Sequence, residues 1–286
     1  LLVIGFFKMI NRKTILLNEH LSITILIPFR NELSRFGDLL KSLQELDDSN
    51  CNLYVTFIND HSNDGSQDYL KEWALNTNKK TSILKLENNV FGKKAAIELG
   101  VNNASSDWIF TLDADSYLDA DFLLEFQSKM IKGKELYLLP VREFGNGVFL
   151  SKIESSILSS ITFSCLGLNW PLLSNGTGMI YKRVRFLELN PYADNSKLLS
   201  GDDLFLLDKM VAYNRSLITG FNQQSLTVYT SGPLTYKEMI FRAVRWAAKM
   251  KNSSKTDTSF VGLVVLLCNL SLIPICVYHL YNSYLF

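Results

Sequence analysis

The amino-acid sequence predicts an α/β fold with a mostly parallel central sheet. Two features predict it: short apolar runs alternate with segments whose apolar residues recur at helical spacing, and polar clusters follow several of the apolar runs. The chain has 286 residues, 47% of them hydrophobic and 20% charged, which fits one large domain, or one domain with appendages, and excludes a disordered protein. A formal net charge of +1 excludes a general nucleic-acid binder. Four cysteines without a CxxC pair do not fit a zinc ribbon or a disulfide framework.

The expected strands and helices alternate along the first half of the chain. The strands are expected over residues 23–27, 53–58, 83–86, 108–112 and 136–140. The helices between them are expected around residues 36–46, 69–74, 95–101 and 122–130. A ligand of such a sheet binds beyond the carboxyl ends of its strands. The polar residues that directly follow each strand are therefore the candidate site residues.

Three polar clusters follow expected strands, over residues 28–32, 59–66 and 113–115. In the third, Asp113 and Asp115 are separated by one residue, so their carboxylates leave the strand on the same side. Like charges that close repel unless a cation lies between them, and hard oxygen ligands suit Mg²⁺ or Mn²⁺. We therefore expect Asp113 and Asp115 to bind a divalent metal ion. In the second cluster, Asp64-Gly65-Ser66 is typical of a turn.

Further groups point to anion binding and to helix capping. Gly92-Lys93-Lys94 opens an expected helix, and a helix N-terminus with a lysine attracts anions, although ordinary surface lysines give the same pattern. Asp202 and Asp203 precede another helical segment, where carboxylates can serve only as helix caps unless a further role is implied. Residues 148–173 are apolar and aromatic, which fits a core helix or an interfacial helix beside a membrane.

The C-terminal region predicts a membrane segment. Residues 260–281 contain no Asp, Glu, Lys or Arg, and a helix of that length spans about 33 Å, enough to cross a bilayer core. A buried helix of a soluble domain is the alternative. Residues 1–8 fit the end of a truncated N-terminal membrane helix, and we expect the chain to be a fragment because it begins with Leu1. Basic residues flank both segments toward the middle of the chain, which predicts a cell-membrane protein whose middle region faces the cytoplasm.

Seven motifs, in this order and spacing, resemble those of the inverting family 2 glycosyltransferases, which have a GT-A nucleotide-sugar-binding fold. They are ILIPFRNE (25–32), FINDHSNDGS (57–66), GKKAAIELG (92–100), TLDADSYLD (111–119), NGTGMIYKR (175–183), SGDDLFL (200–206) and RAVRW (242–246). The last motif is similar to the Q/RxxRW motif of the membrane-anchored branch, which includes ceramide glucosyltransferases and processive polysaccharide synthases. Arg242 stands where Gln is commoner.

The resemblance implies a role in donor binding for several residues. Those expected to contact the nucleotide-sugar are Pro28, Arg30 and Glu32 around the nucleoside, Asp60 at uracil, Asp113 near the ribose, and Lys93 and Arg245 at the diphosphate. Asn59 stands where the family usually has the first of two acidic residues. Asp115, together with Asp113, would bind the metal ion, Mg²⁺ or Mn²⁺.

On the catalytic and acceptor side, the resemblance implies Asp203 as the general base, with Asp202 beside it. The residues expected near the acceptor are Trp246 and the loop of Gly176, Thr177 and Gly178. The implied organisation is a membrane-helix remnant over 1–8, a GT-A catalytic domain over 22–232, a basic interfacial helix over 233–257 and a transmembrane helix over 260–281.

The implied function is transfer of a sugar, with inversion, from a nucleotide-sugar to an acceptor hydroxyl. The donor is expected to be UDP-linked, and the acceptor lipid-linked or a polysaccharide, with a single addition to a lipid-linked acceptor preferred. Two alternatives stay open. An inactive homologue that serves as a membrane scaffold is disfavoured by the presence of Asp113, Asp115 and Asp203. A sugar-phosphate nucleotidylyltransferase would need a glycine-rich loop after the first strand, where residues 28–40 contain only Gly37.

Overall fold

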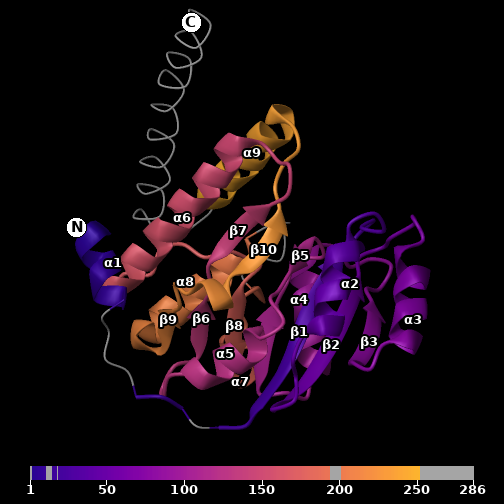
Figure 1. The fold of residues 1–286 in the computed structure, drawn as a ribbon, viewed down its shortest axis with the longest axis horizontal. Coiled ribbons are helices and arrows are strands. Elements are labelled where there is room, and N and C mark those ends of the chain that lie inside the picture. The colour runs from indigo at the N-terminus through magenta and orange to yellow at the C-terminus, as the bar shows by residue number, and fades with distance from the viewer. Residues whose placement is uncertain (1, 11–14, 18, 194–200, 252–286) are drawn as a thin grey trace, which may run out of the picture.

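The computed structural model describes residues 2–10, 15–17, 19–193 and 201–251, and it contains a large and a small sheet (Figure 1). The large sheet is formed by β1 (Leu21–Phe29), β2 (Cys51–Asn59), β3 (Lys80–Lys85), β4 (Trp108–Thr111), β6 (Leu136–Leu138), β8 (Met179–Lys182) and β9 (Ile218–Gly220). The small sheet is formed by β5 (Ser116–Tyr117), β7 (Val141–Phe144) and β10 (Val228–Ser231), in the order β5-β10-β7.

The helices occupy the connections and the outer surfaces. They are α1 (Leu2–Ile10), α2 (Phe36–Glu45), α3 (Ser66–Asn76), α4 (Lys93–Asn103), α5 (Phe122–Lys129), α6 (Phe149–Gly167), α7 (Arg183–Leu189), α8 (Asp202–Asn214) and α9 (Tyr236–Lys251). Short 3₁₀ turns cover Arg215–Leu217 and Gln224–Leu226.

The large sheet has the strand order β3-β2-β1-β4-β8-β6-β9, and its strands are mostly parallel, as the sequence predicts. The exception is β8, which runs antiparallel to both β4 and β6. The strand expected over residues 136–140 is β6, and β8 lies between β6 and β4 in the sheet. Because β8 starts opposite the end of β4, with Met179 paired to Thr111, the loop that precedes β8 lies at the carboxyl end of β4.

Successive side chains of each strand point to opposite faces of the sheet and pack into two apolar layers, one on each face. On one face, Ile23, Ile25 and Ile27 of β1 pack with buried residues of α2, α3 and α5. On the other face, Leu26 of β1 packs with buried residues of α4, α7, α8 and the end of α6. Helices thus cover both faces and leave the strand ends as the place for a binding site.

An outer layer is formed by α6, with α9 running beside it and α1 packed near its end (Figure 1). At the α1–α6 contact, a Cβ on Gly5 would lie 2.1 Å from the Ser164 carbonyl oxygen, so only glycine fits there. In the described part of the chain, no helix is both long and apolar enough to cross a bilayer. The expected transmembrane segment 260–281 lies outside the described residues.

Candidate active site

The loops that follow β1 and β2 are joined by hydrogen bonds from backbone N–H groups to side chains. These bonds run from Asn31 to Ser62 Oγ (3.0 Å), from Glu32 to Ser66 Oγ (3.1 Å), from Leu33 to Asp64 Oδ2 (3.1 Å) and from Asn63 to Asn31 Oδ1 (2.9 Å). Hydrogen bonds from Ser66 also hold the pKa of Asp64 below its usual range. The predicted turn at Asp64-Gly65-Ser66 is confirmed, and it fixes the two loops as one rim.

Asp60, directly after β2, holds the turn that starts α4. It is buried, with Oδ2 accepting a hydrogen bond from the Gly92 N–H (3.0 Å) and Oδ1 lying 3.1 Å from His61 Nδ1. Gly92 has φ +96°, in the left-handed region that glycine tolerates best. Asp60 therefore fixes the backbone just before Lys93. Its expected contact with uracil stays a prediction.

Lys93 connects two carboxylates in the middle of the site. Its Nζ lies 2.6 Å from Asp113 Oδ1 and 3.3 Å from Asp202 Oδ2. Burial lowers the pKa of Lys93, but the two carboxylates outweigh that effect and raise the pKa above its ordinary value. Lys93 is thus a fixed positive charge at the N-terminus of α4, as expected for a diphosphate-binding group.

The predicted acidic pair Asp113 and Asp115 follows β4. Burial and the neighbouring Asp113 carboxylate raise the pKa of Asp115 to about 6, although Asp115 Oδ1 accepts a hydrogen bond from the Thr230 hydroxyl (3.1 Å). Burial raises the pKa of Glu32 as well, opposed by Arg35 and reinforced by Asp115 and Asp113. The three carboxylates therefore share one electrostatic environment, in which a cation is favoured.

The loop before β8 packs directly against these charges. A Cβ on Gly176 would lie 2.7 Å from Asp202 Oδ2 and 2.9 Å from Lys93 Nζ, so the charges approach because this residue has no side chain. Thr177 is almost fully buried, and its hydroxyl accepts a hydrogen bond from the Asp113 N–H (3.1 Å). Gly178 has φ +95° and packs near Val141. The described contacts thus give this loop a positioning role, and its expected contact with an acceptor stays a prediction.

Asp202 and Asp203 form the first turn of α8 rather than preceding it. Gly201, at φ +100°, is the residue before the helix, so neither aspartate occupies the N-cap position. Asp202 is buried beside Lys93, whereas Asp203 is partly exposed and lines the cavity. Carboxylates in a first turn also stabilise a helix N-terminus, so the role of Asp203 as a general base stays a prediction.

One cavity of about 440 Å³ joins most of the predicted residues. Those that line it are Lys93, Asp113, Asp115, Gly176, Thr177, Gly178, Asp202, Asp203 and Arg245. Among the described residues, Pro28, Arg30, Glu32 and Asp60 are not in its lining. They lie on or after β1 and β2, at the rim formed by the joined loops. The structure thus brings the phosphate, metal and base candidates together and places the nucleoside candidates beside them.

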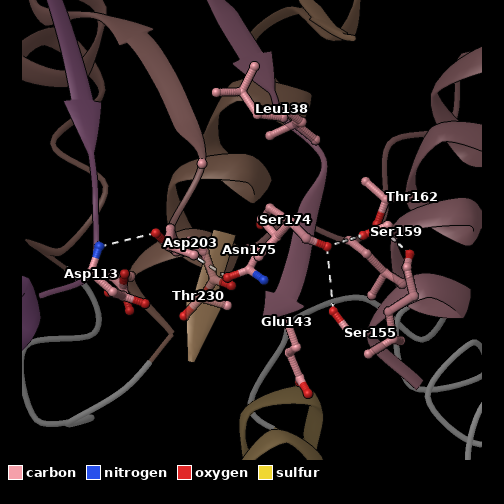
Figure 2. Close-up of a pocket in the computed structure, with 18 of the residues that line it drawn as sticks. Asp113, Leu138, Glu143, Ser155, Ser159, Thr162, Ser174, Asn175, Asp203 and Thr230 are labelled. Carbon is pink, nitrogen blue, oxygen red and sulfur yellow. Dashed lines mark hydrogen bonds between the residues drawn. The ribbon is translucent and has the colours of Figure 1, made fainter. Parts of the chain in front are cut away.

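The far end of the cavity is lined by residues that the sequence did not single out. Figure 2 shows Asp113, Asp203 and Thr230 at one end and Ser155, Ser159 and Thr162 of α6 at the other. Ser159 donates a hydrogen bond to the Val141 carbonyl oxygen (3.1 Å). A spacing of three to four residues along residues 148–173 could have identified this hydroxyl face.

The RxxRW segment lies on α9. Arg245 is exposed and lines the cavity. Arg242 lines it too, and its guanidinium contacts Glu143 and Glu154. Trp246 belongs to α9, and the position of its side chain lies outside what the structure describes.

The donor set of Asp113 and Asp115 fits a Mg²⁺ or Mn²⁺ ion that is shared with phosphate oxygens. Both are hard oxygen ligands, and burial together with the neighbouring Asp113 carboxylate raises the pKa of Asp115, a cost of ionisation that a bound cation would relieve. Among the described residues, no group of three or more His, Cys, Asp or Glu side chains is arranged to hold a metal alone. Substrate oxygens and water would complete the coordination, which is usual for Mg²⁺ at phosphate sites.

The described part of the chain has a GT-A-like α/β fold with a charged cavity at the carboxyl ends of the strands. The sequence model described as glycosyl transferase family 2 matches residues 24–218, more than half of the chain. The chain belongs to this family and is a glycosyltransferase.

One relative and three solved structures are similar to the chain. The chain is 23% identical over 233 residues to the uncharacterized glycosyltransferase YkcC of Bacillus subtilis, covering 73% of this chain and 71% of that protein. A mannosyltransferase from Pyrobaculum calidifontis, in complex with GDP-Man and Mn²⁺, has a TM-score of 0.66 at 15% identity, covering 99% of this chain and 82% of that one. Residues 1–349 of Staphylococcus aureus TarS, with UDP-GlcNAc, have a TM-score of 0.54 at 17% identity, covering 87% and 71%. The chain spans 43% of a longer TarS chain.

Proposed function

We propose that this chain transfers a sugar from a UDP-sugar to an acceptor hydroxyl with inversion, with a divalent metal ion at Asp113 and Asp115. The single observation that carries the proposal is the convergence of Lys93, Asp115 and Asp203 on one cavity. The similar proteins in complex with UDP-GlcNAc or with GDP-Man and Mn²⁺ support a nucleotide-sugar donor and a metal ion.

The donor side of the cavity stabilises the leaving group. As the bond between the anomeric carbon and the phosphate oxygen breaks, its electron pair leaves with the nucleoside diphosphate. Lys93 and Arg245 are positive groups that line the cavity, and they stabilise the negative charge that develops there. A metal ion at Asp113 and Asp115 would supply further Lewis-acid stabilisation of the diphosphate.

Asp203 accepts the proton. The acceptor oxygen forms a bond to the anomeric carbon while its hydroxyl proton passes to the Asp203 carboxylate, a step worth about 10²–10⁴-fold in rate. Asp202 does not compete for this role, because its carboxylate is buried and paired with Lys93. Attack from the face opposite the leaving diphosphate gives inversion of the anomeric configuration.

The far end of the cavity takes the acceptor in this proposal. The hydroxyl face of α6 is suited to hydrogen bonding with a hydroxylated acceptor, and Leu138 and Leu158 line the same region. A lipid-linked acceptor and a membrane location, with the catalytic domain on the cytoplasmic side, are supported by exposed apolar side chains on two helices. These are Val3, Ile4 and Phe7 of α1 and Ile240, Phe241 and Val244 of α9.

A donor screen tests the proposal. Thermal unfolding is followed with UDP-, GDP- and dTDP-sugars, each with Mn²⁺, with Mg²⁺ or with EDTA. We expect UDP-sugars to raise Tm only with a divalent ion, because a ligand that binds the folded state alone stabilises it. The absence of a shift with every nucleotide would contradict the proposed function. A shift with GDP-sugars alone would correct the nucleotide but keep the reaction.

Flotation with lipid vesicles tests the membrane part separately. The purified chain is mixed with vesicles of phosphatidylcholine and phosphatidylglycerol, and we expect it to float with them. A variant with Ile4→Ser and Phe7→Ser, both on the exposed face of α1, should float less. Recovery of both proteins at the bottom of the gradient would contradict membrane association and leave the reaction untouched.

A further inference from the structure

The described part of α9 has little apolar contact with the rest of the protein. Between residues 236 and 245 no side chain belongs to the buried core, and Tyr236, Ile240 and Val244 are each more than 60% exposed. Only Met239, Arg242 and Ala243 are partly buried there, which places them on the inward face of the helix. Something other than core packing must hold this segment, and Arg242 is its longest inward side chain.

Arg242 makes a set of charge-assisted contacts that join three elements. Its Nη1 donates to Glu143 Oε1 on β7 at 2.5 Å, and its Nη2 donates to Ser151 Oγ at 2.5 Å and to Glu154 Oε2 at 3.4 Å, both on α6. Ser151 in turn donates to Glu143 Oε2 at 2.5 Å. A planar guanidinium provides donors to several acceptors at once, which a lysine ammonium does less well.

The partners of Arg242 are buried carboxylates. The side chains of Glu143 and Glu154 are 2% and 8% exposed, and that of Arg242 is 16% exposed. A buried carboxylate is strongly destabilising without a cation, so both glutamates favour the position of α9 that inserts Arg242 between them. Gly232, just before the helix, makes room for this arrangement, because a Cβ there would lie 2.6 Å from Glu143 Oε2.

The helix that Arg242 holds also carries Arg245 into the reaction cavity. Both arginines line the cavity, three residues apart on α9. We propose that Arg242 is a positioning residue: its ion pairs with Glu143 and Glu154 hold α9 against β7 and α6 and thereby keep Arg245 at the leaving diphosphate. The catalytic part of this inference rests on the proposed function, whereas the attachment of α9 does not.

Limited trypsin digestion tests the attachment of α9 without any substrate. We compare the wild type with Arg242→Gln and with Lys237→Gln, a control that removes one positive charge from the exposed face of the same helix. Cleavage after Arg245, followed by mass spectrometry, should be about fivefold or more faster in Arg242→Gln, because proteolysis follows the open population. Cleavage outside α9 in Arg242→Gln, and cleavage after Arg245 in the control, should stay at the wild-type rate. An unchanged rate after Arg245 would overturn the proposal.

A double-mutant cycle tests the connection to Arg245. We expect Arg242→Gln to lower kcat/KM roughly tenfold to hundredfold, since a small displacement of a catalytic group has that effect. Arg245→Gln should give a similar loss, and the double variant should lose no more than Arg245→Gln alone. Losses that multiply would show that Arg242 contacts the substrate itself and would overturn the positioning role.

Arg242→Lys, which keeps the charge, should recover part of the activity and of the trypsin resistance. Should Arg242→Gln fail to fold, Glu154→Gln provides the same comparison.

Discussion

The donor side and the acceptor side of the cavity are built from different kinds of interaction. On the donor side, the loops after β1, β2 and β4 are fixed by hydrogen bonds to backbone N–H groups, such as Gly92 to Asp60 and Asp113 to Thr177. On the acceptor side, β7, α6 and α9 are joined through side chains, among which Arg242 and Glu143 are 99 residues apart. The loops of the donor side are therefore fixed mainly through their main chain, although Lys93 also pairs with Asp113 and Asp202, whereas α9 on the acceptor side is attached through side-chain pairs.

Substitutions on the two sides should therefore have different effects. Substitutions at the donor rim should alter nucleotide binding or local stability, because the backbone there is shaped by the residues replaced. Substitutions on the acceptor side, apart from Arg242 and Arg245 of α9, should leave nucleotide binding largely intact and alter transfer. Asp203 lies where the two sides meet, and its replacement is the strongest test of that division.

We expect the largest effect from Asp203→Asn. The amide cannot accept the acceptor proton, so kcat should fall about 10²–10⁴-fold while donor affinity stays near that of the wild type. Transfer kinetics and titration calorimetry with the nucleoside diphosphate measure the two quantities. Asp208→Asn, the same substitution further along α8, is the matched control and should keep its activity. Near-normal turnover in Asp203→Asn would remove this residue as the base.

Asp115→Asn should have the next largest effect, this time on binding. Loss of one carboxylate from the metal site should weaken Mn²⁺-dependent binding of the nucleoside diphosphate by about 10–100-fold. Asp119→Asn, close in the chain but outside the cavity lining among the described residues, should bind as the wild type does. Calorimetry with Mn²⁺ and with EDTA separates the two contributions. Equal affinities for the wild type and Asp115→Asn in Mn²⁺ would rule out the metal role.

Gly176→Ala tests how closely the two sides approach each other. The added methyl group would meet Asp202 Oδ2 and Lys93 Nζ at under 3 Å, so the ion pair must move. We expect kcat/KM to fall roughly tenfold with a smaller change in Tm, because a displaced cation stabilises the leaving group less well. Gly37→Ala, in α2 with open space around it, should leave activity unchanged. Wild-type kinetics in Gly176→Ala would show that the Lys93 position is not critical.

The sequence predicted the donor side well, for a physical reason. Parallel strands bring their carboxyl ends to one edge of the sheet. In a doubly wound sheet, the residues that directly follow β1, β2 and β4 therefore lie close together at that edge. Asp113 and Asp115 were found in this way, and Lys93 was found as a lysine at the N-terminus of the helix after β3. The direction of β8 was not found, because nothing in its four residues distinguishes a parallel from an antiparallel neighbour.

The acceptor side could be predicted only in part. The RxxRW resemblance identified α9 and Arg245, but the partners of Arg242 depend on how β7 and α6 pack, which local periodicity does not encode. Thr230, which hydrogen-bonds Asp115, comes from a strand of the small sheet that the sequence did not predict. Asp60 was expected at uracil, yet its described contacts are with Gly92 and His61. A side chain that fixes the backbone through hydrogen bonds, as Asp60 does, has no sequence pattern that identifies this role.

The smallest expected effect is that of Ser66→Ala, which tests whether the rim is held by single hydrogen bonds. Ser66 is fully buried, and its hydroxyl accepts from the Glu32 N–H at 3.1 Å, so its removal should lower stability by about 1 kcal/mol and Tm by roughly 2–4 °C. The variant should also bind the nucleotide slightly less tightly, because Glu32 belongs to the expected nucleoside pocket. Ser128→Ala, at an exposed position on α5, is the control and should keep its Tm. Equal Tm values for Ser66→Ala and the wild type would show that the loops after β1 and β2 keep their shape without this hydrogen bond. The difference between the donor side and the acceptor side would then be smaller than the structure indicates.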